Sequence, residues 1–141
     1  MSKILWSGVK LTEKSQKDLN YALRKFLWPI LQIGWVQQNS PPAGVTPTLL
    51  PDHMTMAPHA MPEKWREHLG QKVLLEAKQF GICPYAAAVA VETDLPSFNQ
   101  TKHVTVAVSP YGKPFHSNEI KVWYDLDDWI ELHGIVIEEG A

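Results

Sequence analysis

Two short segments of the chain carry the same pattern, a histidine and a threonine separated by one apolar residue. They are His53-Met54-Thr55 and His103-Val104-Thr105, and 50 positions separate the two histidines. Apolar and polar residues alternate through both segments, which is typical of β-strands. Because side chains two apart on a strand share a face, we expect each histidine to lie beside its threonine, with apolar residues behind them.

These residue types could catalyse phosphodiester cleavage without a metal ion. That reaction needs one group to take a proton from the attacking oxygen and another to give a proton to the leaving oxygen. Histidine can do either near neutral pH, because its unperturbed pKa is about 6.5. A threonine hydroxyl on the same face could donate to a phosphoryl oxygen. We therefore interpret His53, Thr55, His103 and Thr105 as candidate catalytic residues.

The remaining sequence predicts an α+β fold with a mainly antiparallel sheet. Residues 3–11 predict a first strand, Thr12 is a candidate helix N-cap, and Pro29 is expected to end the helix near Leu27 or Trp28. The expected apolar stripe of that helix is Leu19, Ala22, Leu23, Phe26, Leu27 and Ile30.

Further along, the punctuation by proline and glycine predicts more strands and connectors. The expected elements are a short strand within 32–38, a loop over 39–51, a short helix from Pro62 through Leu69 closed by Gly70, an antiparallel pair over 72–77 and 85–92 joined by a loop over 79–84, a connector over 94–101, a turn over 109–114 followed by the segment 115–118, and a last strand over about 129–138.

Composition restricts the function classes. The 141 residues are most simply one domain, 1–141, and the net charge of −2 gives no overall positive field to attract nucleic acid. The one cysteine, Cys83, excludes an internal disulfide and a cysteine-based zinc site. No apolar run approaches the roughly 18 residues of a membrane span, so we expect a soluble, cytoplasmic protein.

The two His-x-Thr segments resemble the paired signature of the 2H phosphoesterases, which are named for their two histidines. A first strand ending Gly8-Val9-Lys10-Leu11 before a helix is similar to the start of those domains. The stretch His103 to Asn118, with Gly112-Lys113-Pro114 and Ser117-Asn118, resembles the phage-associated "Swiss Army Knife" branch linked to RNA repair. The resemblance implies two lobes of antiparallel sheet with flanking helices, whose motifs face each other across a central cleft.

The resemblance also implies a substrate class. Members of the superfamily act on RNA ends and on cyclic nucleotides, and viral members destroy cyclic-oligonucleotide immune signals. We therefore expect a nucleotide, a cyclic oligonucleotide or an RNA 2′,3′-cyclic phosphate end as substrate, with counter-defence as the role if the source is a virus. The near-neutral charge favours a small ligand over long RNA.

Four further residues are candidates for substrate binding. Lys113 could contact a phosphate, His116 follows the second motif closely, and Tyr111 and Trp6 could stack on a base. No cofactor is expected, and no metal is expected because no His-Glu-x-x-His or carboxylate-rich grouping occurs.

The sequence leaves two other functions open. The cleft could bind a nucleotide or RNA end without turnover, as a sequestering protein. Alternatively, the histidines could merely pack within a structural or interaction domain. The sequence does not distinguish which histidine is the acid and which the base, and it does not determine the oligomeric state.

Overall fold

A computed structural model describes residues 4–31, 53–108 and 113–140 of the chain. The expected strand within 32–38, the loop over 39–51 and Tyr111 lie outside the described residues. The elements in chain order are β1 Ile4–Leu11, α1 Glu13–Leu31, β2 His53–Ala57, the 3₁₀ helix η1 Glu63–His68, β3 Lys72–Ile82, β4 Ala86–Glu92, β5 His103–Val108, the 3₁₀ helix η2 Pro114–Glu119 and β6 Trp123–Gly140.

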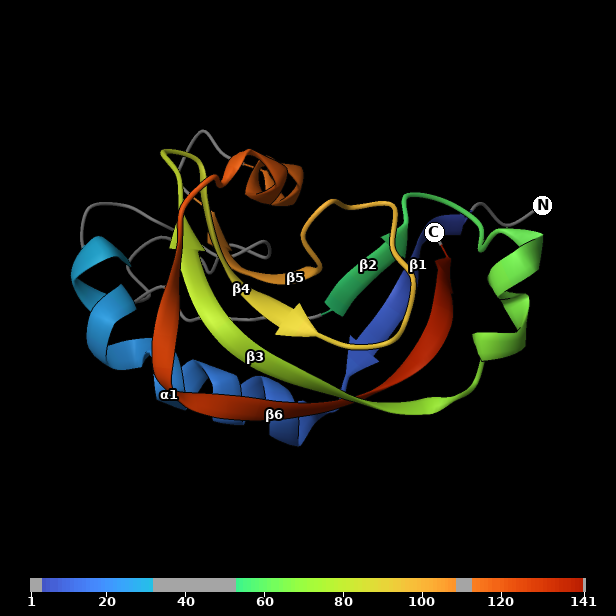
Figure 1. Cartoon of the computed structure of the whole chain (residues 1–141), viewed down its shortest axis with the longest axis horizontal. Coiled ribbons are helices and arrows are strands. Elements are labelled where there is room, and N and C mark those ends of the chain that lie inside the picture. Colours follow the sequence, from blue (N-terminus) through green and yellow to red (C-terminus); the bar gives the residue numbers. More distant parts are fainter. Residues whose placement is uncertain (1–3, 32–52, 109–112, 141) are drawn as a thin grey trace.

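The strands form one closed barrel in the order β1-β2-β5-β4-β3-β6, with β6 returning to β1. Every neighbouring pair is antiparallel. Helix α1 packs against β6 on the outside, and η2 packs on β4 and β5 (Figure 1). The expected α+β architecture with antiparallel strands is therefore confirmed.

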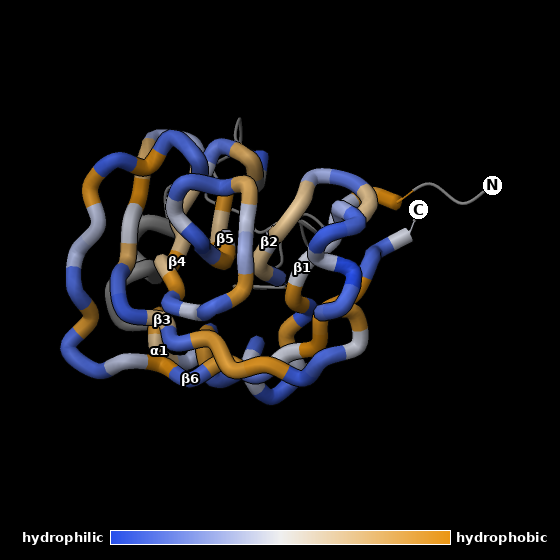
Figure 2. The backbone as a smooth tube through the Cα atoms, turned by 45° about the vertical axis from the view of Figure 1, so that its right-hand side comes forward, coloured by the Kyte–Doolittle hydropathy of each residue, from blue (hydrophilic) through white to orange (hydrophobic). Residues whose placement is uncertain are grey.

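The interior is apolar because alternate residues of each strand point inward. Hydrophobic and hydrophilic residues follow one another along the strands in Figure 2, and the connecting segments are mainly hydrophilic. Strand β4 is the exception, since all of its residues from Ala86 to Val91 are buried. The largest fully buried side chains are Leu19, Leu23, Met54, Met56, Leu75, Leu132, Val9, Val89, Val104, Val106 and Val136.

Helix α1 starts as the sequence predicts but ends later. The Thr12 hydroxyl accepts a hydrogen bond from the Ser15 amide at 3.2 Å, so Thr12 is the N-cap. Leu19 and Leu23 are fully buried, as predicted, whereas Ala22 is exposed. The helix continues through Pro29 to Leu31, so the predicted end was wrong. Pro29 lies in the last turn, so it removes one amide donor and only two helical residues follow it.

Two strands are longer than the sequence indicates. Strand β3 continues through the expected loop to Ile82, which pairs with Ala87, leaving only Cys83, Pro84 and Tyr85 between β3 and β4. Strand β6 begins at Trp123 rather than near 129, because its first half pairs with the end of β3. The expected short helix after Pro62 is a 3₁₀ helix, and Gly70 follows it with a φ of 83°. Segment 114–119, for which no helix was expected, is also a 3₁₀ helix.

Among the described residues, no helix is both long enough and apolar enough to cross a membrane.

Candidate functional site

The two His-x-Thr segments lie side by side, because β2 and β5 are neighbours in the barrel. Met54 pairs with Val104, and both side chains are fully buried. In an antiparallel pair, this register places His53 across from Thr105 and Thr55 across from His103. The four side chains therefore share the face opposite Met54 and Val104, related by a local twofold axis through that pair. Their sequence spacing alone could not show this, because β2 and β5 are far apart along the chain.

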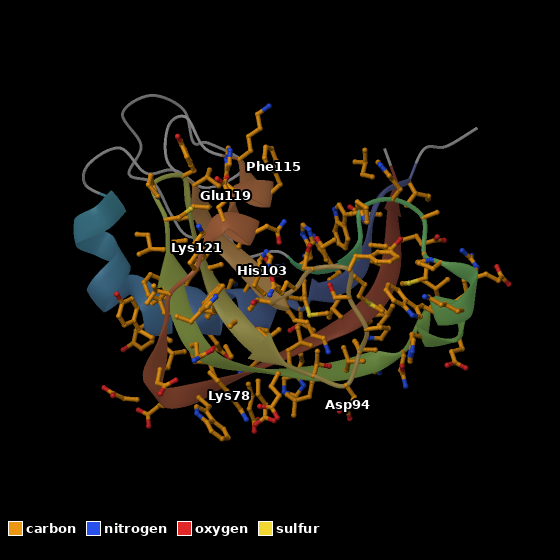
Figure 3. All side chains as sticks on the ribbon, turned by 45° about the horizontal axis from the view of Figure 1, so that its top comes forward. Lys78, Asp94, His103, Phe115, Glu119 and Lys121 are labelled. Atoms are coloured by element: carbon orange, nitrogen blue, oxygen red, sulfur yellow. The ribbon has the colours of Figure 1, made fainter. Side chains whose placement is uncertain are left out.

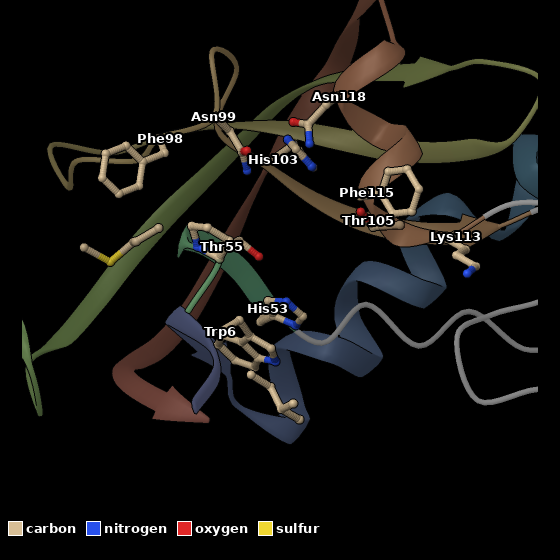
Figure 4. Close-up of a pocket in the computed structure, with 13 residues that line it drawn as sticks. Trp6, His53, Thr55, Phe98, Asn99, His103, Thr105, Lys113, Phe115 and Asn118 are labelled. Carbon is tan, nitrogen blue, oxygen red and sulfur yellow. The ribbon is translucent and has the colours of Figure 1, made fainter. Parts of the chain in front are cut away.

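The same register sets the separation of the two histidines. They occupy diagonal positions of the ladder, and diagonal Cα atoms in an antiparallel pair lie roughly 7–8 Å apart. In Figure 4 the four side chains stand at the corners of a four-sided cluster, with the histidines at opposite corners. A tetrahedral group placed inside this cluster would have one imidazole on each side.

The cluster opens into a cavity of about 480 Å³. That volume lies within the roughly 300–1,000 Å³ of small-molecule sites. The lining side chains come from β1, β2, β5, η2 and the segment before β5, together with Pro58 after β2 and Lys113 before η2 (Figure 4). They are Leu5, Trp6, His53, Thr55, Met56, Pro58, Phe98, Asn99, His103, Thr105, Lys113, Phe115 and Asn118.

Trp6 positions the ring of His53. The indole and imidazole are stacked, with centroids 3.7 Å apart and an angle of 7° between the planes. One face of the indole is therefore covered by His53. Stacking of two flat rings restricts rotation of the imidazole about its side-chain bonds. Trp6 also lines the cavity, so its stacking on a base of the substrate stays a prediction.

His103 is the more buried of the two histidines, with 7% of its surface exposed. Its Nδ1 lies 2.8 Å from the carbonyl oxygen of Thr101. Burial lowers the pKa of His103 from its ordinary value of 6.5. The hydrogen bond to Thr101 raises this pKa, and the charge of His53 lowers it, but burial has the largest effect.

The hydrogen bond fixes the tautomer of His103. A carbonyl oxygen can only accept, so Nδ1 must carry the hydrogen and donate it. In the neutral ring that burial favours, Nε2 then carries a lone pair. His103 is therefore set up as a base at Nε2.

The two threonines have different surroundings. The Thr105 hydroxyl lies 2.8 Å from the Ser117 hydroxyl of η2, and Ser117 is 1% exposed. If Ser117 donates to Thr105, the Thr105 hydrogen can point to a ligand. Thr55 lines the cavity, and its backbone carbonyl accepts a hydrogen bond from the Ser97 hydroxyl at 2.9 Å.

The cavity has a local electrostatic character that the net charge does not reveal. Among the described lining residues, the ionisable side chains are His53, His103 and Lys113, and none is acidic. Lys113 is exposed at the start of η2. A site with histidines, a lysine and no carboxylate favours an anionic ligand.

The structure does not bring His116 to the cavity. Its Nδ1 accepts a hydrogen bond from the Lys113 amide at 2.9 Å, and its Nε2 lies 3.6 Å from a carboxylate oxygen of Glu119. Its ring contacts Tyr85 and Phe115, with centroids 4.6 Å and 4.4 Å away. His116 thus stabilises the 3₁₀ helix η2, which carries Phe115 and begins directly after Lys113.

Sequence reasoning missed several lining residues in the segment before β5 and on η2. Phe98 and Phe115 are 61% and 62% exposed, and both line the cavity. Figure 3 shows Phe115 on η2 above His103, whereas Asp94 lies toward the opposite side. Asn99 and Asn118 flank His103 in Figure 4. Their only sequence signal is closeness to the second motif: Asn99 precedes it, and Asn118 follows it.

The segment before β5 is held in place by β2. The Phe98 amide donates to the Met56 carbonyl at 2.9 Å, and the Asn99 amide donates to the Ser97 hydroxyl at 3.1 Å. Since Ser97 also contacts β2, these bonds hold Phe98 and Asn99 beside the histidines.

No group of three or more histidine, cysteine, aspartate or glutamate side chains that could hold a metal ion occurs among the described residues.

The fold and the cavity together define a small antiparallel α+β barrel with a two-histidine, two-threonine pocket. No protein-family model and no curated protein sequence matches this chain.

Proposed function

We propose that the chain is a metal-independent phosphodiesterase of the 2H type, which cleaves a nucleotide phosphodiester. The observation that supports this most directly is the convergence of His53, Thr55, His103 and Thr105 on one cavity that has no acidic lining side chain among the described residues. One imidazole on each side of a phosphorus-sized space is the arrangement that in-line displacement needs.

The environments of the two histidines suggest their roles. The lone pair on His103 Nε2 takes the proton of the attacking oxygen, either water or a ribose 2′-hydroxyl. His53, held by Trp6, gives a proton to the leaving oxygen. Each turnover leaves His103 protonated and His53 neutral, and proton exchange with water resets both. In the reverse direction the roles exchange.

The threonines and Lys113 act on the phosphoryl oxygens. Thr55 and Thr105 donate hydrogen bonds as negative charge develops, and Lys113 supplies a positive charge at the mouth of the cavity. The exposed rings of Phe98 and Phe115 offer flat apolar surfaces for the bases of the substrate.

The cavity supports a small substrate. One lysine and an apolar rim suit a cyclic nucleotide, a cyclic oligonucleotide or an RNA 2′,3′-cyclic phosphate end better than a long RNA, whose backbone usually needs several cations. If the source is viral, the proposed role is to degrade a cyclic-oligonucleotide defence signal in the cytoplasm.

The barrel is compatible with the two-lobed arrangement of the 2H phosphoesterases. One side consists of β1, β2 and the end of β6, and the other of β3, β4, β5 and the start of β6. The site lies where these halves meet at the pair Met54–Val104. We propose that the two halves correspond to the two lobes.

The test is a substrate panel with EDTA present, read by mass spectrometry. The panel contains nucleoside 2′,3′-cyclic phosphates, cyclic dinucleotides, cyclic trinucleotides and an RNA with a 2′,3′-cyclic phosphate end. We expect His53→Ala and His103→Ala each to reduce turnover by about 10²- to 10⁴-fold, the usual contribution of a general acid or base. His133→Ala is the matched control, because His133 is exposed on β6.

The outcomes separate the alternatives. Product masses distinguish hydrolysis from internal transesterification. Tight binding without product over hours would identify a sequestering protein instead. The proposal would be rejected if His53→Ala and His103→Ala both kept wild-type turnover. It would also be rejected if the protein bound no member of the panel.

A further inference from the structure

A second, smaller cavity adjoins the first at His103. Its volume is about 240 Å³, and His103 lines both cavities, together with Asn99 and Asn118. The second cavity is also lined by Gln100 and by Trp123 at the start of β6. We call it the carboxamide chamber, after the side-chain amides of Asn99, Gln100 and Asn118.

The chemistry of the chamber differs from that of the two-histidine cavity. Among the described residues that line it, His103 is the only ionisable one. A side-chain amide offers two N–H donors and an acceptor oxygen, and an indole offers a flat aromatic surface. Such a lining recognises a neutral, planar ring with donors and acceptors on its edge. Charged groups would lack a counter-charge there.

The chamber is too small for a whole nucleotide-sized ligand, since sites for drug-sized ligands usually have about 300–1,000 Å³. Its volume of about 240 Å³ suits one ring system. The chamber adjoins the two-histidine cavity at His103. A ligand with its ring in the chamber can therefore place an attached group between the two histidines.

The walls of the chamber are held from two sides. Hydrogen bonds from Ser97 and Phe98 to β2 fix the segment that carries Asn99. On the opposite wall, Trp123 packs on Gly81 of β3: a Cβ added at Gly81 would lie 2.7 Å from Trp123 Cε3. Glycine at this position therefore allows the indole to lie against the strand.

We propose that the carboxamide chamber binds one nucleobase of the substrate, attached on one side of the reacting phosphate, and selects among bases through their hydrogen-bonding edges. This inference rests on the proposed function, which places the phosphate between the histidines. Carboxamides pair with base edges in directional, often bidentate contacts, so they discriminate between bases. The substrate class is then a phosphodiester with a preferred base, rather than any phosphodiester.

The first experiment measures base binding without catalysis. The protein is labelled with ¹⁵N and titrated with adenosine, guanosine, cytidine and uridine, which carry no phosphate. The indole N–H signal of Trp123 is assigned as the signal lost in Trp123→Phe. We expect one nucleoside to shift this signal at lower concentration than the other three, and Asn118→Leu to weaken that shift.

The second experiment measures selectivity in turnover. The readout is the ratio of kcat/KM for the preferred nucleoside 2′,3′-cyclic phosphate to kcat/KM for bis(4-nitrophenyl) phosphate, which has no base. We expect Asn99→Leu and Asn118→Leu to lower this ratio about tenfold, since one directional base contact contributes discrimination of about that size. Gln71→Leu is the matched control, because Gln71 is an exposed carboxamide next to η1 and outside the chamber.

The two experiments fail in different ways. If no phosphodiester is cleaved but one nucleoside still shifts the Trp123 signal, the proposed catalysis is wrong, and base binding by the chamber is supported on its own. If phosphodiesters are cleaved but no nucleoside shifts Trp123 and the ratio is the same in all variants, the chamber does not bind a base. Equal shifts with all four nucleosides would overturn the claim of selection.

Discussion

At the scale of single residues, the two histidines are chemically different although their motifs are alike. His103 is buried and donates from Nδ1 to a backbone carbonyl, whereas His53 is partly exposed and stacked on Trp6. Pairs of titratable groups placed in different environments are a common basis for dividing acid and base roles. The asymmetry arises outside the motifs, from Thr101 and Trp6.

The lowered pKa of His103 gives a prediction for stability. In the unfolded chain the pKa of this imidazole is about 6.5, whereas burial lowers its pKa in the folded protein. The contribution to the free energy of unfolding is therefore complete above pH 6.5 and is lost as the pH falls toward the lower pKa of the folded state. We expect urea denaturation to show stability falling below pH 6.5 and a flatter profile for His103→Asn.

Two features make that comparison sharp. Asparagine can keep a donor near the position of Nδ1 but does not titrate, so the hydrogen bond to Thr101 is retained while the proton site is removed. His53 and Lys113 also line the cavity, and the His53→Gln variant is measured in parallel. His133→Gln, which changes an exposed histidine, should keep the wild-type profile. An unchanged slope in His103→Asn would show that His103 does not control it.

The contact between Thr105 and Ser117 gives a second prediction at this scale. The hydroxyls are 2.8 Å apart and Ser117 is buried, so we expect a coupling of about 0.5–1.5 kcal/mol, the usual net value of a hydrogen bond. A double-mutant cycle with Thr105→Val and Ser117→Ala, measured by urea denaturation, gives this coupling. A coupling near zero would show that the hydroxyls do not stabilise each other.

At the scale of elements, the close approach of β1 to β2 depends on Gly8. A Cβ at this position would lie 2.0 Å from the Met54 carbonyl oxygen, and Gly8 pairs with Thr55. Gly8→Ala must therefore push β1 away from the strand that carries the first motif. We expect a loss of about 1–3 kcal/mol or more in the free energy of unfolding, together with reduced turnover.

Gly70 is the matched control for Gly8. No atom lies within 4 Å of a Cβ built there, but its φ of 83° disfavours other residues. Gly70→Ala should cost about 1–2 kcal/mol through backbone conformation alone. Because Gly70 does not line the cavity, turnover per folded molecule should not change. Equal loss of turnover in both variants would argue against a steric effect at β2.

These elements also show how far the sequence could predict the site. The side-by-side placement of histidine and threonine follows from strand periodicity, so both motifs were correctly placed on strands. The pairing of β2 with β5 has no local signal, because it depends on how the barrel closes. Phe98 and Asn99 belong to an irregular segment whose position is set by hydrogen bonds to β2. No periodic pattern in the sequence indicates such contacts.

At the scale of the whole molecule, the site lies at the shortest junction of the barrel. Among the described residues, β2 and β5 are joined by one Cα pair, whereas β3 and β6 are joined by nine. The long ladder holds the two halves of the barrel together on the side away from the site. The halves could therefore separate slightly at β2 and β5 without disrupting the core.

This difference predicts where the barrel opens first. Alternate amides of a strand point to opposite neighbours, so roughly half of those in β2 and β5 face the short junction. By hydrogen exchange and mass spectrometry, we expect segments 53–57 and 103–108 to contain a fast-exchanging fraction that 72–82 lacks. If the proposed function is right, a nucleoside 2′,3′-cyclic phosphate added to His103→Asn would bridge β2 and β5. It should then slow that fraction and leave 72–82 unchanged. Faster exchange in 72–82 than at the junction, or no protection by the ligand, would contradict a junction that opens at the site.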